Sequence, residues 1–320
     1  MGVTDIFVLH QVKSDQVDGD IQQFFENSFL ELTHHRVGLD NWPSKAQLDT
    51  LCERAAGFFV YAVATVKFVN RLNSNPRTQL DRLLQSQEST VHEGKTKFKT
   101  NTTLDLLYMT ILQEAFGDDD PEDDIKIRYV LGTVVLPINP LSQSSISILL
   151  GLDIGDLAPI LSSVHSLLVL PEDINHPVQP FHKSFPDFLT NPTRCTNPRF
   201  HVPPSHNLEL LVSLLNLMNK KLEKNMCRLP EAVKNSEVDD LKERTEKYIN
   251  HALQYACKSW HKHLVNNPVV SKHEITSALH HFLEKKFLFW LEVLSVLGAV
   301  RNAVDALKVA VKWLEVCFFF

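Results

Sequence analysis

Glycine is scarce in this chain. Only 10 of the 320 residues are glycine, about 3% against about 7% in average proteins. Because tight turns and phosphate-binding loops rely on glycine, its scarcity disfavours a fold built on them and favours a mostly helical one. Hydrophobic residues make up 44% and charged residues 22% of the sequence, a composition typical of an ordinary globular protein rather than a disordered one.

Cysteine pairs at redox or metal-binding spacing are missing as well. The five cysteines lie far apart and form no C-x-x-C motif; they are Cys52, Cys195, Cys227, Cys257 and Cys317. An odd number of scattered cysteines argues against a disulfide framework and a zinc ribbon, and fits a reducing compartment. We therefore expect a cytoplasmic protein.

Long uncharged hydrophobic runs do not occur. The most apolar segment, 287–320, contains six charged residues, and its longest uncharged stretch is the eight residues Val293–Val300. A membrane-spanning helix needs about 20 apolar residues. The first ten residues also lack the basic and apolar regions of a signal peptide. We expect buried helices in the apolar segment and no membrane contact.

Positive charge is not in excess either. The formal net charge is −6; residues 1–205 carry 16 basic and 25 acidic residues, and residues 206–320 carry 16 and 13. Such a balance provides no electrostatic attraction to nucleic acid over the chain as a whole. We expect no nucleic-acid partner.

Helical periodicity dominates the pattern of apolar residues that is present. Apolar residues recur every three or four positions in most segments between residues 18 and 116, as in amphipathic helices. Pro43 and Ser44 open one of these helices, with Ser44 as the expected N-cap. Upstream, Asp5–Val12 is apolar enough for one strand. Because a lone strand has two unpaired edges, we interpret it as the end of an α/β domain.

The order of elements changes after residue 124. Three short helices are predicted, and two short apolar segments follow them with the turn EDINHP in between. Three helices followed by a hairpin are typical of a winged helix. The helices are expected at 125–136, 144–150 and 156–165, and the strands at 167–170 and 178–181.

The predicted fold class is therefore mainly α. We expect a short N-terminal α/β remnant, a helical domain, a winged-helix domain with a small β-hairpin, and a second helical domain. In the last domain, 272–314 is expected to form one long helix. The corresponding boundaries are 1–42, 43–120, 121–204 and 205–320.

Catalytic and phosphate-binding motifs are incomplete. Gly94-Lys95-Thr96 has the form of a P-loop ending, but the glycine required five residues earlier is Ser89, and the preceding segment is polar rather than a buried strand. No G-x-S-x-G or H-E-x-x-H motif occurs. We expect no enzyme activity, no catalytic residue and no cofactor held by this chain alone.

Two groups of residues have the composition of metal ligands. Six acidic residues lie within 118–124, but acids also stabilise the start of the helix predicted there. Cys257 and His261 lie four residues apart on a predicted helix, but a zinc site requires a second such pair in a defined geometry. We therefore predict no metal site, and interpret both groups as solvated or packed side chains.

His182 is the one polar residue that suggests binding. It directly follows the second predicted strand and precedes a short helix in the segment PFHKSFPDFLTNP. A histidine at such a position is able to direct an imidazole N–H toward an anion. We single out His182 as the candidate binding residue.

Several longer segments resemble fungal NACHT-domain proteins, which are STAND-type signalling ATPases related to NLR immune receptors and often carry C-terminal WD repeats. The resemblance covers nearly the whole chain and follows the family's order. The segments that carry it are CERAAGFFVYAVATVKFV (Cys52–Val69), EGKTKFKTNTTLDLLYMTIL (Glu93–Leu112), FHKSFPDFLTNP (Phe181–Pro192), HALQYACKSWHKHL (His251–Leu264) and FLEKKFLFWLEVLSVLG (Phe282–Gly298).

The resemblance implies a regulatory role. The chain would extend from the end of a NACHT core to the helical region before the repeats, as in a truncated gene model. Its partners would be the NACHT core and the C-terminal repeat domain of the parent protein, which would bind ADP or ATP with Mg²⁺ and form homo-oligomers. His182 falls where the family's winged helix contacts the β-phosphate of ADP. The P-loop and the Mg²⁺-binding acids are not in this sequence.

Two other functions stay open from the sequence alone. One is a helical protein-interaction scaffold with no nucleotide role. The other is a winged-helix nucleic-acid binder, although residues 126–205 carry five basic and five acidic residues, and the segment 156–165 contains no lysine or arginine. Readers of DNA need several basic phosphate contacts, which disfavours this last alternative.

Overall fold

The chain is mainly α-helical, as predicted. The computed structural model describes residues 14–71, 74–88, 100–117, 121–231, 233–265 and 272–319, and within them the strands form one two-stranded sheet. Two compact units are formed. Unit 1 comprises the described part of 1–119 with 163–168 and 181–188, and unit 2 comprises the rest. The predicted strand Asp5–Val12 lies outside the described residues, and the four predicted domain boundaries stay a prediction.

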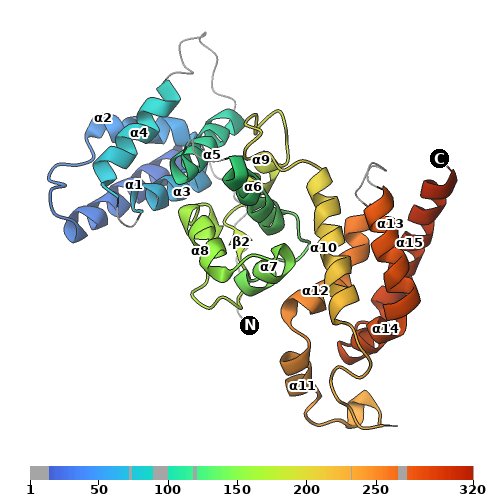
Figure 1. The fold of residues 1–320 in the computed structure, drawn as a ribbon. Helices are drawn as coiled ribbons and strands as arrows, with labels where there is room; N and C mark the ends of the chain where they lie inside the picture. Colours follow the sequence, from blue (N-terminus) through green and yellow to red (C-terminus); the bar gives the residue numbers. More distant parts are fainter. Residues whose placement is uncertain are drawn as a thin grey trace. The chain divides into compact units, whose positions relative to one another are not determined.

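Unit 1 is a group of helices around an aromatic core (Figure 1). Helix α1 packs against α2 and α3, and α3 packs against α4 and α5. The rings of Phe25 and Phe29 stack with centroids 5.8 Å apart, and Trp42 meets Phe29 edge-on at 5.3 Å. The helices are α1 (Ser14–His35), α2 (Lys45–Ala55), α3 (Phe59–Val69), α4 (Pro76–Glu88), α5 (Thr100–Phe116) and most of α9 (Ser184–Leu189).

Local sequence determines where several of these helices begin and end. The predicted N-cap Ser44 is confirmed: its hydroxyl accepts the Gln47 N–H at 3.3 Å, and the Gln47 side chain accepts the Ser44 N–H at 2.9 Å. Beyond the end of α3, the Arg36 guanidinium donates to the carbonyl of Ser74 at 2.7 Å and to that of Arg71 at 3.3 Å. Such contacts satisfy carbonyl groups that lack a partner at helix ends and in the following turn.

Unit 2 begins with the elements predicted for the winged helix. The helices α6, α7 and α8 are followed by strands β1 and β2, which pair with each other, in the predicted order. Leu168 of β1 belongs to unit 1. Both strands are only two residues long, shorter than expected. Among the described residues no single helix is long and apolar enough to span a membrane, and α7 with α8 passes that test only as a pair bent by 120°. The elements are α6 (Pro121–Val135), α7 (Gln143–Leu150), α8 (Ile154–Ser163), β1 (Leu168–Val169) and β2 (Gln179–Pro180).

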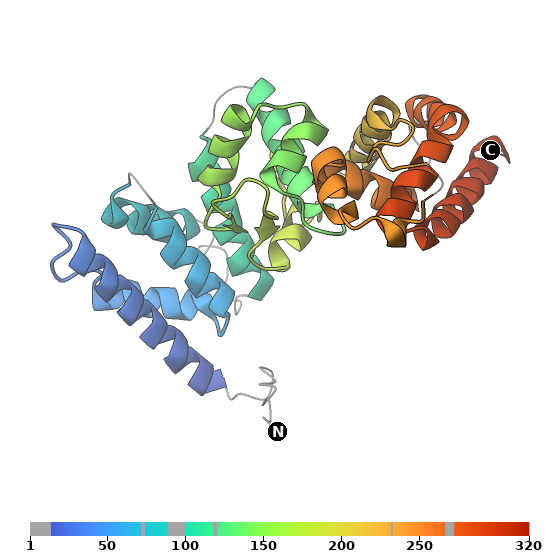
Figure 2. The same cartoon turned by 90° about the horizontal axis from the view of Figure 1, so that it is seen from below.

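The rest of unit 2 is helical, and α10 packs against both α12 and α13 (Figures 1 and 2). Trp260 on α12 and Trp290 on α14 are fully buried, and each meets the Phe282 ring edge-on at 5.5 Å. The elements are α10 (Ser205–Lys221), the 3₁₀ turn η2 (Asn235–Glu237), α11 (Leu241–Tyr248), α12 (His251–Val265), α13 (Lys272–His281), the π-helical turn η3 (Phe282–Lys286), α14 (Phe287–Val296) and α15 (Arg301–Phe319).

The prediction of one helix over 272–314 is wrong. The π-helical turn η3 interrupts it first, and α14 then ends in a turn before α15 starts. Gly298 adopts φ +64°, and its N–H donates to the Ser295 carbonyl at 3.1 Å, while the Ala299 N–H donates to the Leu294 carbonyl at 2.8 Å. This is the Schellman arrangement that ends helices at a left-handed glycine. The apolar spacing continues on both sides of the turn, which is why the pattern did not reveal it.

A buried hydrogen-bond network joins α10 to α12. The Ile138 N–H donates to the Tyr255 hydroxyl at 3.2 Å, and that hydroxyl lies 2.7 Å from His263 Nε2. His263 Nδ1 lies 2.6 Å from Asn207 Oδ1. Because the amide oxygen only accepts, Nδ1 carries the proton and Nε2 accepts from Tyr255. A neutral His263 therefore satisfies all the groups in the network.

Acid is expected to destabilise the protein through His263. Burial lowers the pKa of His263 from its ordinary 6.5 to about 4. Between pH 6.5 and pH 4 the unfolded chain binds a proton at this histidine that the folded chain does not. The free energy of unfolding is therefore expected to fall by about 3 kcal/mol as the pH decreases from above 6.5 to about 4. Urea unfolding of the wild type, His263→Gln and the exposed control His251→Gln between pH 7 and pH 4 measures this. If the free energy of unfolding of His263→Gln falls as steeply with decreasing pH as that of the wild type, His263 is not the cause.

Gly132 allows a second close contact between α6 and α10. A Cβ atom at this position would lie 2.4 Å from two atoms of the His206 ring. The His206 ring is buried and is held by Glu209, whose carboxylate lies 3.2 Å from Nδ1. The ring also packs on Tyr129, with centroids 4.9 Å apart. The imidazole is thus in contact with Glu209 and with the Tyr129 ring.

We expect Gly132→Ala to destabilise the protein by about 1–3 kcal/mol, because the methyl group overpacks the contact with His206. Gly155→Ala is the matched control. Gly155 also lies in a helix, but nothing is within 4 Å of its added Cβ. Gly155→Ala should therefore raise the free energy of unfolding by about 0.5–1 kcal/mol. Chemical unfolding measures both, and a neutral or stabilising Gly132→Ala would show that the contact is not tight.

Candidate functional site

The predicted binding residue His182 lies on the surface of unit 1, between β2 and α9. Its side chain is exposed, and its Nδ1 atom faces the start of α9. The Ser184 N–H donates to Nδ1 at 3.2 Å, and the Ser184 hydroxyl lies 2.7 Å from the same nitrogen. A short local turn therefore fixes the orientation of the imidazole ring.

A hydrogen-bond chain connects this exposed ring to the core. The Ser184 hydroxyl lies 2.7 Å from the hydroxyl of Tyr108 on α5. Tyr108 is buried, and the rings of Phe185 and Phe188 pack on it with centroids 5.3 and 5.5 Å away. The apolar residues of α9 thereby hold Ser184, and through it His182, in register with α5.

This arrangement selects one form of the imidazole. A backbone N–H only donates, so Nδ1 of His182 must be the acceptor and the neutral ring carries its proton on Nε2. Within the described part of the chain, no residue hydrogen-bonds Nε2 of His182. The site therefore offers an N–H donor to a partner outside this unit.

A lysine lies beside the same loop. Lys67 Nζ on α3 lies 4.2 Å from the ring centroid of Phe181, the residue directly before His182. Its side chain is half-buried, and burial lowers the pKa of Lys67. Among the described residues no carboxylate forms an ion pair with Lys67. The loop thus has an N–H donor at His182 and a lysine ammonium against the neighbouring Phe181 ring, and each of these groups is able to bind an anion.

The residues weighed as metal ligands do not converge in the described structure. Asp118–Asp120 lie outside the described residues, and Asp124 in the first turn of α6 pairs with Arg199. Cys257 is buried, which raises the pKa of its thiol, and the neighbouring His261 is buried on the same helix. The described residues contain no group of three that could hold a metal ion. Gly94-Lys95-Thr96 also lies outside them.

Sequence motifs did not point to Lys67, Tyr108 or Ser184. Ser184 carried a weak signal, because a serine at the start of a short helix often bonds to nearby backbone or side-chain groups. Lys67 and Tyr108 gave none: both lie in apolar helical segments in which only packing was expected.

Comparison of the chain with protein-family models, curated proteins and solved structures finds no match. The candidate site is therefore defined by its own geometry. Its elements are the exposed Nε2–H of His182, the hydrogen bonds that orient the ring, and the ammonium group of Lys67.

The hydrogen bond between Tyr108 and Ser184 is expected to appear as an energetic coupling. Tyr108→Phe and Ser184→Ala each remove one hydroxyl, so a double-mutant cycle on unfolding free energies should give a coupling of about 0.5–1.5 kcal/mol. Thr33→Ala replaces Ser184→Ala in the control cycle, because the Thr33 hydroxyl donates to Leu30 within its own helix. If the effects of Tyr108→Phe and Ser184→Ala on the free energy of unfolding are additive, the two hydroxyl groups do not interact.

Proposed function

We propose that this chain is the non-catalytic regulatory part of a NACHT STAND signalling NTPase. In this role its helical and winged-helix domains gate the ADP or ATP state and the oligomerisation of the parent protein. The observation that supports it best is the fixed, outward Nε2–H of His182 at the end of the small hairpin. It is supported by the resemblance of the sequence to fungal NACHT proteins, which implies a phosphate-contacting histidine at this position.

The residues around His182 fit a phosphate group. A hydrogen-bond donor whose ring is already oriented loses little entropy on binding, and a half-buried ammonium strengthens the interaction with a negative charge. His182 and Lys67 would hold the terminal phosphate of ADP that is bound by the NACHT core. Mg²⁺ and the P-loop belong to that core, and no residue of this chain is assigned a catalytic step.

The gating mechanism is a shift between two populations of the parent protein. His182 contributes only to the closed state, in which it reaches the nucleotide; in the open state the contact is lost. A hydrogen bond to a charged group contributes about 1.5–3 kcal/mol, which shifts the closed-to-open ratio about 10- to 150-fold. Loss of the nucleotide would release the winged helix and allow oligomerisation.

The other proposed partners follow from this role. They are the NACHT core and the C-terminal repeat domain of the parent protein, together with further copies of it in the oligomer, in the cytoplasm. A helical scaffold without a nucleotide role is the competing function. It differs in one measurable respect, because a scaffold has no use for His182 as a phosphate donor.

We expect His182→Ala to weaken ADP retention about tenfold or more in the parent protein that contains the P-loop core. The dissociation rate of a fluorescent ADP analogue measures this, with Lys183→Ala, the exposed neighbour, as the matched control. The chain without that core should bind ADP no tighter than micromolar in a calorimetric titration. Unchanged ADP retention in His182→Ala would favour the scaffold, and nanomolar ADP binding by this chain alone would overturn the division of roles.

A further inference from the structure

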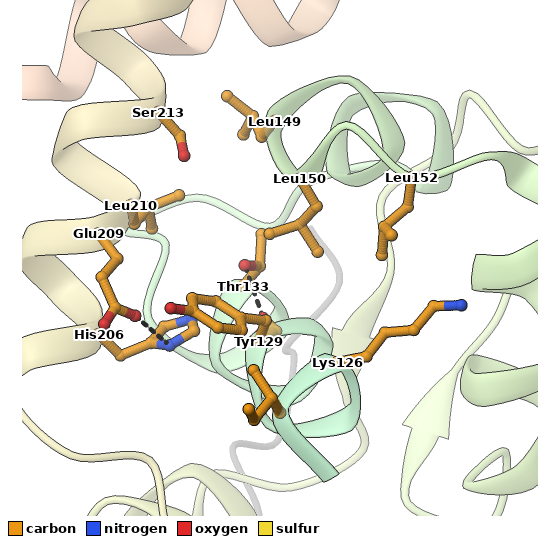
Figure 3. A pocket seen from close by; sticks show the side chains of 11 residues that line it. Lys126, Tyr129, Thr133, Leu149, Leu150, Leu152, His206, Glu209, Leu210 and Ser213 are labelled. Atoms are coloured by element: carbon orange, nitrogen blue, oxygen red, sulfur yellow. Dashed lines mark hydrogen bonds and ion pairs between the residues drawn. The ribbon is translucent and has the colours of Figure 1, made fainter. Parts of the chain in front are cut away.

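A cavity in unit 2 has the size of a small-molecule site. Its volume is about 400 Å³, and it lies between α6, α10 and the end of α7 (Figure 3). Pockets that bind small ligands typically measure about 300–1,000 Å³ and combine apolar walls with a few polar groups. This cavity has both: Leu149, Leu150, Leu152 and Leu210 form apolar walls, and polar side chains lie at its edges.

Glu209 places a negative charge at one edge of the cavity. Its side chain is 45% exposed, so it is accessible to a ligand. The carboxylate lies 3.2 Å from His206 Nδ1, and the Tyr129 hydroxyl also helps to lower its pKa. These donors, the His206 bond first, hold the pKa of Glu209 below its ordinary value. Glu209 is therefore ionised at neutral pH.

The nearby lysine and arginine side chains form no ion pair with Glu209 among the described residues, although the charge of Arg128 helps to lower its pKa. Lys126 Nζ lies 3.7 Å from Asp156, and Figure 3 shows its side chain extending on the side of the cavity opposite Glu209. The Arg128 guanidinium donates to the Pro198 carbonyl at 3.1 Å. In the described part of the chain, neither lysine nor arginine lies within ion-pair distance of Glu209. Among the described residues, His206 is thus the one side chain at ion-pair distance from Glu209, and the exposed part of the carboxylate has no lysine or arginine against it.

We propose that this cavity binds a small organic ammonium ion: an amphipathic amine whose apolar body contacts the leucine walls and whose protonated nitrogen pairs with Glu209. The ring of Tyr129 lies at the same edge and attracts a cation through its π-face. Ser213, one turn beyond Glu209 on α10, also lines the cavity and offers a hydroxyl oxygen to a second N–H. An anionic ligand of the same shape is disfavoured, because its charge would meet that of Glu209.

Three indole ligands that share one body and differ in their head group test this proposal. Tryptamine carries an ammonium, tryptophol a hydroxyl and indole-3-propionate a carboxylate. Calorimetric titration of the whole chain at pH 7 should give tryptamine the highest affinity, about tenfold above tryptophol, with indole-3-propionate weakest. Equal affinities of tryptamine and tryptophol, or no tryptamine binding at millimolar concentration, would overturn the proposal.

Variants locate the ligand. Glu209→Gln should remove the tenfold advantage of tryptamine and leave tryptophol unchanged, whereas Glu223→Gln, an exposed control just beyond α10, should alter neither. Ser213→Leu fills part of the cavity and should weaken all three ligands. An unchanged tryptamine advantage in Glu209→Gln would refute the role of this carboxylate. Thermal unfolding verifies that each variant folds; if Glu209→Gln does not, the head-group order in the wild type decides.

Discussion

Desolvation of two imidazole rings, His263 and His206, is the constraint on which the packing of α10 against α12 and α6 depends. A buried polar ring is costly unless its nitrogens find partners. His263 meets this requirement through Tyr255 and Asn207, and His206 meets it through Glu209. His182 differs, because within the part of the chain that the structure describes only its Nδ1 is bonded, and the ring is exposed. The bonding of these three rings thus separates His263 and His206, which join helices, from His182, whose Nε2 has no partner among the described residues.

The few glycines of the chain include two that this architecture requires. Gly132 lets the buried His206 ring approach the backbone of α6, which brings α6 and α10 together beside the cavity. Gly298 takes a left-handed conformation that ends α14 and starts the turn into α15. An alanine would overpack the first position and strain the second. The low glycine content of the chain agrees with a helical fold. Gly132 and Gly298 are nevertheless difficult to substitute.

Local features were predictable and long-range ones were not. The cap at Ser44 and the order of helices and strands from α6 to β2 follow from residues close together in the sequence, so the pattern identified them. The break between α14 and α15 was missed, because apolar spacing continues through it. Tyr108 and Ser184 are 76 residues apart, and the cavity combines three separate segments. Such juxtapositions arise from tertiary packing, which periodicity does not encode.

The two candidate sites have opposite electrostatic character. In unit 1 an N–H donor and a lysine flank Phe181 and suit an anion, whereas in unit 2 Glu209 and the Tyr129 ring suit a cation. A phosphate and an amine would therefore not compete for the same residues. For an amine to alter nucleotide retention, it would have to bind the closed and open states with different affinity, since a ligand with equal affinity for both shifts neither population. Because the cavity lies between α6 and α10, such a difference in affinity would depend on how these two helices pack, and the close approach of Gly132 and His206 is one contact of that packing.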